Sequence, residues 1–151
     1  MVEEGTMTDL LGCPGALRVN HGTARDQGGT MTDGITRLEK KRFDSPDETR
    51  RPFEKGKIEA VTVGNLVFNR ETLEPGWRWS EHVKPVAGTE SCQKYHVKYI
   101  VSGRQRVIME DGSELVLEPG DVAVMPPGHD AWVEGDEPNV LLELIGLVQR
   151  P

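Results

Sequence analysis

A cysteine and a histidine lie four residues apart in the segment 92–103, CQKYHVKYIVSG, and a glutamate lies two residues before the cysteine. If this segment is an extended strand, Glu90, Cys92 and His96 project from one face, because strand side chains alternate with a period of two. A carboxylate, a thiolate and an imidazole together suit zinc, or alternatively iron or nickel, whereas a thiolate is a poor ligand for magnesium and calcium. The spacing raises the hypothesis of a transition-metal site on a strand.

The same residues also have a purely structural interpretation. Cysteine is among the most often buried residue types and packs as a small hydrophobe. Glu90 is close enough to the start of the expected strand to lie on the surface. Lys98 weighs against a metal ion, because by strict alternation it shares the face of His96, and an ammonium beside a cation is unfavourable unless it is paired or held away. The residues alone leave both interpretations open.

The elements that would position these side chains are short alternating segments, which begin at residue 58. Segments such as KIEAVTV, YHVKYIV and RVIME are separated by turn signals, among them Asp111-Gly112, a strong hairpin pair. We count eight or nine such segments, about 8–12 residues apart, and none has a convincing helical periodicity. The pattern predicts an all-β fold, either a barrel or a sandwich.

The chain has a net negative charge, which is unevenly distributed along the sequence. The formal net charge is −7, and all of it belongs to residues 58–151, because residues 1–57 are neutral. An acidic domain without a basic stripe argues against nucleic acid and anionic membrane surfaces as partners. No apolar run reaches the roughly 18–20 residues of a membrane span, and no secretory signal is visible. With only Cys13 and Cys92, a poor disulfide pair, we expect a cytoplasmic protein.

The amino-acid composition changes along the chain and predicts three parts. Residues 1–34 are rich in glycine and threonine and are expected to be a disordered tail. Residues 35–57 are highly charged and are expected to form an extended lead-in to a β domain at 58–148. The string MTD occurs at Met7 and again at Met31, which suggests that natural translation starts at Met31. The intact mass of the native protein would test that hypothesis.

The segment 101–132, VSGRQRVIMEDGSELVLEPGDVAVMPPGHDAW, resembles the small single-domain cupins of the jelly-roll superfamily. Two blocks carry the resemblance: the first ends in Gly103, and the second is the glycine–proline pattern of PGDVAVMPPG at 119–128. The similarity covers roughly residues 60–145. It implies a jelly-roll barrel of six to eight strands that holds a small-molecule ligand, and, because such barrels often dimerise, a homodimer.

The resemblance also implies a set of metal ligands. Metal-binding cupins place two histidines two residues apart, a glutamate four residues later, and a last histidine in the second block. Glu90, Cys92 and His96 fall at the first three positions, and His129 lies two residues before the fourth, which is Ala131. All four positions are therefore altered, although the set Glu90, Cys92, His96 and His129 retains metal-binding side chains.

Further residues are expected near the ligand. Trp77 and Trp79 lie two apart and would share a face of a strand, where they either pack in the core or form an aromatic wall for the ligand. His82 is a further metal ligand or acid–base group, unless it is structural, and Lys98 would contact the ligand.

Three functions remain open at this stage. The first is a metal-dependent enzyme acting on a small molecule, such as an isomerase or a dioxygenase. The second is a metal-free module that binds or senses a small molecule, and the third is a structural dimerisation barrel. Nothing in the sequence assigns a catalytic residue or a substrate.

Overall fold

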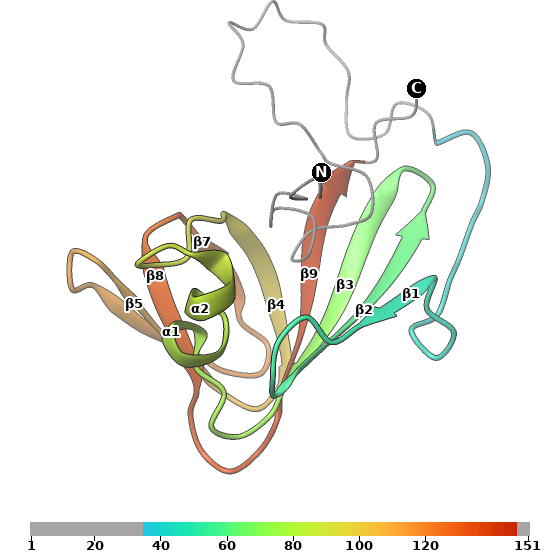
Figure 1. Ribbon diagram of the computed structural model, residues 1–151. Helices are drawn as coiled ribbons and strands as arrows, with labels where there is room; N and C mark the ends of the chain where they lie inside the picture. Colours follow the sequence, from blue (N-terminus) through green and yellow to red (C-terminus); the bar gives the residue numbers. More distant parts are fainter. Residues whose placement is uncertain (1–34, 148–151) are drawn as a thin grey trace, which may run out of the picture.

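The computed structural model describes residues 35–147, which form nine β-strands and two short helices (Figure 1). The strands are β1 (Glu48–Arg50), β2 (Gly56–Val63), β3 (Leu66–Leu73), β4 (His96–Ser102), β5 (Gln105–Met109), β6 (Glu114–Leu117), β7 (Val122–Met125), β8 (His129–Val133) and β9 (Asn139–Leu147). The helices are α1 (Trp79–His82) and α2 (Lys84–Ala87). The residues of the predicted tail, 1–34, and with them Cys13 and Met31, lie outside the described residues.

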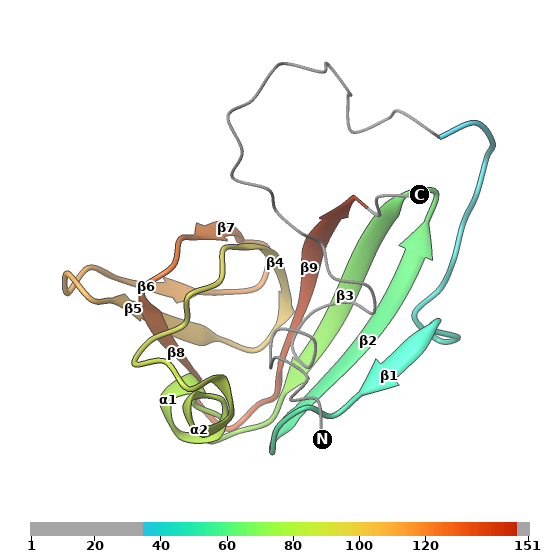
Figure 2. The ribbon, with the colours of Figure 1, turned by 45° about the horizontal axis from the view of Figure 1, so that its top comes forward.

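The strands form two antiparallel sheets. The larger sheet has the order β1-β2-β3-β9-β4-β7, and the smaller has the order β6-β5-β8. The last strand, β9, returns to lie between β3 and β4, a long-range connection that confirms the predicted all-β jelly roll. Figures 1 and 2 show the small sheet folded over from the β4 side of the large sheet, with α1 and α2 beside it.

The core lies between the two sheets and follows the alternation of the strands. In β8, for example, His129, Ala131 and Val133 are buried, and the residues between them are less so. The buried cluster consists of Leu73, Trp77, Trp79, Val83, Cys92, Ile100, Val107, Leu117, Ala123, Met125, Ala131, Val133 and Leu141. Cys92 is thus a member of the core, as the structural interpretation expected.

The prediction for the segment GWRWSEHV at 76–83 was wrong, because it placed Trp77 and Trp79 on a strand and expected no helix. Only Arg78 pairs as an isolated bridge, and α1 begins at Trp79. Trp79 and Val83 are both buried, and residues four apart face the same side of a helix. Over so few residues, alternation of aromatic and polar side chains does not separate a strand from a single helical turn.

The lead-in at 35–57 contains a strand, β1, which pairs with β2, so it is more ordered than an extended connection. It also covers the outer side of β2 and β3. Arg70 donates to the carbonyl of Phe43 at 3.1 Å and lies over its ring, while the Asp47 carboxylate accepts from the backbone N–H of Thr62 at 2.8 Å. Neither helix within residues 35–147 has the length and apolar character to cross a membrane.

Gly103 directly follows β4 and lies in the turn before β5. Its φ angle of 71° lies in the left-handed region, which disfavours other residues. A Cβ atom at this position would lie 2.3 Å from the carbonyl oxygen of Pro138, which belongs to the backbone that enters β9. Only glycine allows β4 and β9 to approach this closely, and this approach helps to place the inner residues of both strands.

Candidate metal centre

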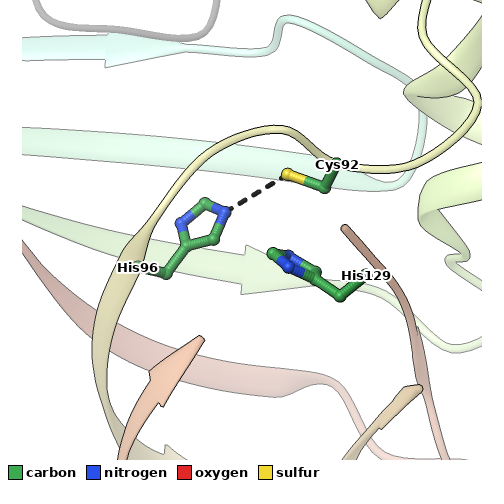
Figure 3. A group of neighbouring side chains, drawn as sticks. All are labelled: Cys92, His96 and His129. Atoms are coloured by element: carbon green, nitrogen blue, oxygen red, sulfur yellow. Dashed lines mark hydrogen bonds between the residues drawn. The ribbon is translucent and has the colours of Figure 1, made fainter. Parts of the chain in front are cut away.

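Three of the predicted ligands, Cys92, His96 and His129, converge inside the barrel. Each offers one ligand atom, and these atoms all lie within 4.8 Å of one another (Figure 3). Cys92 comes from the segment before β4, His96 is the first residue of β4, and His129 is the first residue of β8. The two sheets of the jelly roll therefore meet at this cluster.

Backbone pairing holds Cys92 beside His129. The Cys92 N–H donates to the His129 carbonyl at 2.8 Å, and the Gly128 N–H donates to the Cys92 carbonyl at 2.7 Å. Residues directly opposite each other in an antiparallel pair have Cβ atoms roughly 4.5–5.5 Å apart on the same side. This isolated bridge thus sets the sulfur against the imidazole, although Cys92 lies outside the regular strand.

The His129 ring is fixed by the turn that precedes it. Its side chain is buried, and its Nδ1 lies 2.6 Å from the carbonyl oxygen of Pro126. Because a carbonyl can only accept, Nδ1 carries the proton and Nε2 keeps its lone pair. The Pro-Pro-Gly turn therefore also sets the tautomer of a metal-binding imidazole.

The His96 ring is oriented in the same way by a carboxylate. Its Nδ1 donates to Oε1 of Glu143 on β9, and its Nε2 faces Cys92 Sγ at 3.4 Å. A carboxylate on the far nitrogen is the usual outer partner of metal-bound histidine, since it fixes the ring and raises its basicity. Burial, together with the charge of Lys98 as a smaller cause, lowers the pKa of His96 to about 3.

Both imidazoles are therefore neutral near pH 7, since burial also lowers the pKa of His129 to about 4. Burial raises the pKa of the Cys92 thiol, against a hydrogen bond from the Lys94 backbone N–H and the charge of Lys98. Neutral imidazole is the form that binds metals, and a thiol that coordinates a metal is deprotonated, with the proton released to solvent. Metal binding at this cluster would therefore release the thiol proton.

Charged side chains line the inner face beside the cluster. Lys98 is buried on the face of His96, as alternation predicted, and its Nζ lies 3.8 Å from Oε2 of Glu71. Glu143 lies directly opposite Lys98 in the pairing of β4 with β9. Burial raises the pKa of Glu71 to about 7, helped by Glu143 and opposed by Lys98. The sequence counted the ammonium of Lys98 against a metal ion. In the structure this ammonium is accompanied by the carboxylates of Glu71 and Glu143.

The structure does not bring Glu90 to this cluster. Its side chain is 91% exposed and its carboxylate accepts from Lys84 Nζ at 2.6 Å. The carboxylate found beside His96 is instead that of Glu143, which the sequence analysis missed. A signal for it exists: Glu143 is the lone acid in the apolar segment NVLLELIGL and has the parity of the buried Asn139 and Leu141.

The remaining predicted residues have mainly local roles in the structure. His82 turns back onto its own helix, where its Nδ1 accepts from the Arg78 N–H at 3.1 Å. Trp77 and Trp79 pack in the core, and Trp77 lies against the ring of Phe53 with centroids 6.1 Å apart. These placements agree with the structural alternatives that the sequence left open for all three residues.

The donor set fits a divalent transition metal. One thiolate and two imidazoles are ligands that zinc accepts, and catalytic zinc sites with three protein ligands keep a further position for water or substrate. The softness of the thiolate and the absence of a carboxylate from the three disfavour magnesium and calcium. The arrangement is therefore suited to hold an ion and to present it to a small molecule.

Comparisons with known proteins agree with the fold. Residues 82–140, which include all three residues of the cluster, match the model of the EutQ-like cupin domain. None of the curated proteins matches the chain. A structural genomics protein of Rhizobium leguminosarum is 17% identical with a TM-score of 0.51, and the match covers 76% of this chain and 100% of that one.

Two further solved structures are similar. KdgF from a Halomonas species is 20% identical with a TM-score of 0.48, over 68% of this chain and 89% of that one. An oxalate decarboxylase of Lactobacillus farciminis, solved as a formate complex, is 22% identical with a TM-score of 0.49, over 67% of this chain and 31% of that one. The likeness to the Rhizobium protein, at 17% identity, is one of fold.

Proposed function

The protein carries a cupin-type domain, and on this premise we propose that its barrel binds a small molecule beside a divalent metal ion held by Cys92, His96 and His129. The observation that carries the proposal is that His96 and His129 have the same tautomer, with the proton on Nδ1. In each ring Nδ1 donates to an acceptor of the protein, which leaves Nε2 as the nitrogen that can bind an ion. Without an ion, Nε2 of His96 faces the Cys92 thiol at 3.4 Å. Together with the Cys92 sulfur, these two rings place three possible ligand atoms within 4.8 Å of one another, which is a donor set that one ion would share.

Zinc is the ion that the donor set favours, with iron and nickel as the alternatives. When bound, such an ion would polarise an oxygen of the ligand or activate a water molecule. The residues of the chain supply the rest: Pro126 and Glu143 hold the imidazoles, and the backbone N–H of Lys94 donates to the sulfur.

The experiment that tests the proposal is elemental analysis of protein purified without a metal-affinity tag. We expect close to one equivalent of zinc, iron or nickel in the wild type. The variants Cys92→Ala and His96→Ala should lose it, whereas Glu90→Gln, which alters a predicted ligand that lies on the surface, should retain it. A wild type that holds no ion, even after incubation with each of the three metals, would overturn the proposal.

Cobalt substitution adds a direct test of the sulfur. Cobalt accepts the same ligands as zinc and gives a thiolate charge-transfer band in the near ultraviolet. The band should appear in the wild type and in Glu90→Gln and be absent from Cys92→Ser. Stoichiometric cobalt without such a band would mean that the ion is bound elsewhere.

A further inference from the structure

Cys92 lies on an irregular segment whose shape depends on contacts with its neighbours. Residues 88–95 connect α2 to β4, and within this described segment only Cys92 takes part in β pairing, as the isolated bridge to His129. A connection without a regular hydrogen-bond ladder opens more easily than the strands beside it. The contacts that hold this segment therefore decide how well the Cys92 sulfur is placed for an ion.

A side chain of the β5–β6 hairpin reaches this segment. The hydroxyl of Ser91, the residue before Cys92, donates a hydrogen bond to Oε1 of Glu110, which directly follows β5. Ser91 is only 7% exposed, whereas Glu110 lies on the surface. The side-chain amide of Gln93, the residue after Cys92, donates to the same hydroxyl at 2.8 Å. This contact therefore joins the hairpin to residues on both sides of the cysteine.

The backbone brings Glu110 to the position from which it reaches Ser91. The Glu110 N–H donates to the Gly128 carbonyl at 2.9 Å, and the Gly128 N–H donates to the Cys92 carbonyl at 2.7 Å. The end of β5, the turn before β8 and the Cys92 segment are thus hydrogen-bonded in a row. A Cβ atom on Gly128 would lie 3.5 Å from the Glu110 carboxyl carbon, so the carboxyl group lies over the open side of this glycine.

We propose that Glu110 is a positioning residue of the metal site, which holds the Cys92 segment against the β5–β6 hairpin and thereby controls metal affinity from the surface of the protein. This inference rests on the proposed metal site and names the element that regulates it. Glu110 does not touch the ion and acts through Ser91. Coupling is reciprocal, so a contact that strengthens metal binding is itself stabilised when the ion binds.

The first test is zinc affinity, measured by competition with a chelator of known affinity. Glu110→Ala should bind zinc about tenfold more weakly than the wild type, the lower end of the range for residues that orient metal ligands. Glu110→Gln should bind it nearly as well as the wild type, because its amide oxygen still accepts from Ser91. Wild-type zinc affinity in Glu110→Ala would overturn the inference.

Asp111→Ala is the matched control for the hairpin. Asp111 is the next residue, it is also exposed, and its carboxylate accepts from the Ser113 N–H at 2.8 Å within the hairpin turn. Its removal alters the hairpin but leaves the contact between Glu110 and Ser91, so zinc affinity should stay that of the wild type. A loss equal to that of Glu110→Ala would show that the effect is one of general hairpin stability.

A double-mutant cycle assigns the effect to the contact itself. In the Ser91→Ala background, Glu110→Ala should have no further effect on zinc affinity, because the hydrogen bond is already absent. The same tenfold loss in that background would contradict the inference. The rise in melting temperature on saturation with zinc gives a second measure, since it follows affinity, and it should be smaller in Glu110→Ala than in Asp111→Ala.

Hydrogen exchange tests the reciprocal effect in the wild type, without any variant. Zinc should slow the exchange of the Glu110 N–H more than that of the Asp47 N–H, which donates to Ala60 at 2.9 Å beside β1, at the other edge of the large sheet. Equal effects of zinc on the two groups would overturn the coupling.

The two proposals fail in different ways. If the wild type takes up no metal, the metal site is wrong and the role of Glu110 falls with it. If the wild type binds one equivalent of zinc and Glu110→Ala binds it as tightly, the metal site stands and the role of Glu110 alone is wrong.

Discussion

His96 donates its Nδ1 proton to the Glu143 carboxylate and turns its Nε2 toward Cys92 Sγ, 3.4 Å away. The two residues are 47 positions apart, and the antiparallel pairing of β4 with β9 brings them together. The Glu143 carboxylate thus fixes both the tautomer and the ring orientation of a proposed metal ligand that comes from another strand.

Glu143 is therefore a positioning residue, and its removal should weaken metal binding without removing a ligand. We expect Glu143→Ala to lower zinc affinity about 10–100-fold, the range usual for such outer partners, and Glu143→Gln to have a smaller effect because its amide oxygen still accepts from Nδ1. The measurement is competition with a chelator of known affinity. Glu137→Gln, at an exposed glutamate, is the control, and unchanged affinity in Glu143→Ala would show that the contact does not support the site.

The two buried histidines should make the metal-free protein sensitive to acid. Their pKa values are about 3 and about 4 in the folded protein, against about 6.5 when unfolded, so the unfolded chain binds protons first as the pH falls. The stability they contribute is complete above pH 6.5 and is lost progressively below it. At pH 5 the expected loss is about 2 kcal/mol for each histidine.

Denaturant unfolding between pH 5 and pH 8 measures this loss in protein freed of metal. His96→Gln should unfold with a shallower dependence on pH than the wild type, because one of the two groups no longer titrates. A free energy of unfolding that stays constant from pH 8 to pH 5 would contradict the burial of neutral imidazoles.

Glu71 should act in the opposite direction. Its pKa is about 7 in the folded protein, well above the usual value of 4.5, so the unfolded chain releases its proton first as the pH rises. The contribution of Glu71 to stability is complete below pH 4.5 and is lost as the pH rises through 7. We therefore expect the free energy of unfolding of Glu71→Gln, relative to that of the wild type, to be more favourable at pH 8 than at pH 4.5. Denaturant unfolding of the metal-free protein at the two pH values measures this difference.

Alternation in the sequence was sufficient to predict an all-β fold, and the resemblance to the cupins narrowed it to a jelly roll. The hairpin of β5 and β6 lies at Asp111-Gly112, where the turn signal placed it. The strands β2 and β3 form a second hairpin around Gly64-Asn65. The helix α1 was missed because a single turn buries only Trp79 and Val83, four residues apart, and such a pair has no periodicity to detect.

The candidate site was predictable as far as local spacing determines it. Cys92 and His96 meet as expected, but the regular strand begins at His96, so the rule that placed Glu90 on the same face does not extend to it. Glu143 could not be paired with His96 from sequence alone, because that contact depends on β9 lying between β3 and β4. Long-range strand order, and not residue type, decided which carboxylate serves the site.

Gly103 should be intolerant of any side chain. In Gly103→Ala the Cβ would meet the Pro138 carbonyl at 2.3 Å, at a φ of 71° that already disfavours alanine. We expect a loss of at least about 3 kcal/mol, in line with a severe core clash added to backbone strain. Gly112→Ala is the matched control, since its φ is also positive but no atom lies within 4 Å of the added Cβ. Equal melting temperatures for the two variants would contradict the close approach of β4 and β9.

The homodimer expected from the sequence remains a prediction, and the structure supplies a face for it. On the outer side of β4 and β7, Tyr99 lies opposite Val122 and Val97 opposite Val124, and the two β7 valines are 73% and 59% exposed. The strand β7 is an edge of the large sheet, so a second copy could pair with it about a two-fold axis. An uncharged face is also where two chains of net charge −7 approach with least repulsion.

A charge placed on this face should therefore separate the copies. We expect wild-type protein to sediment as a dimer and Val124→Lys to sediment as a folded monomer, because two lysines would be buried near the axis without partners. Leu115→Lys, at a residue that is 64% exposed on the small sheet, is the matched control and should remain dimeric. A monomeric wild type would refute the dimer, whereas a dimer that survives Val124→Lys but not Leu115→Lys would move the interface from β7 to the strands of the small sheet.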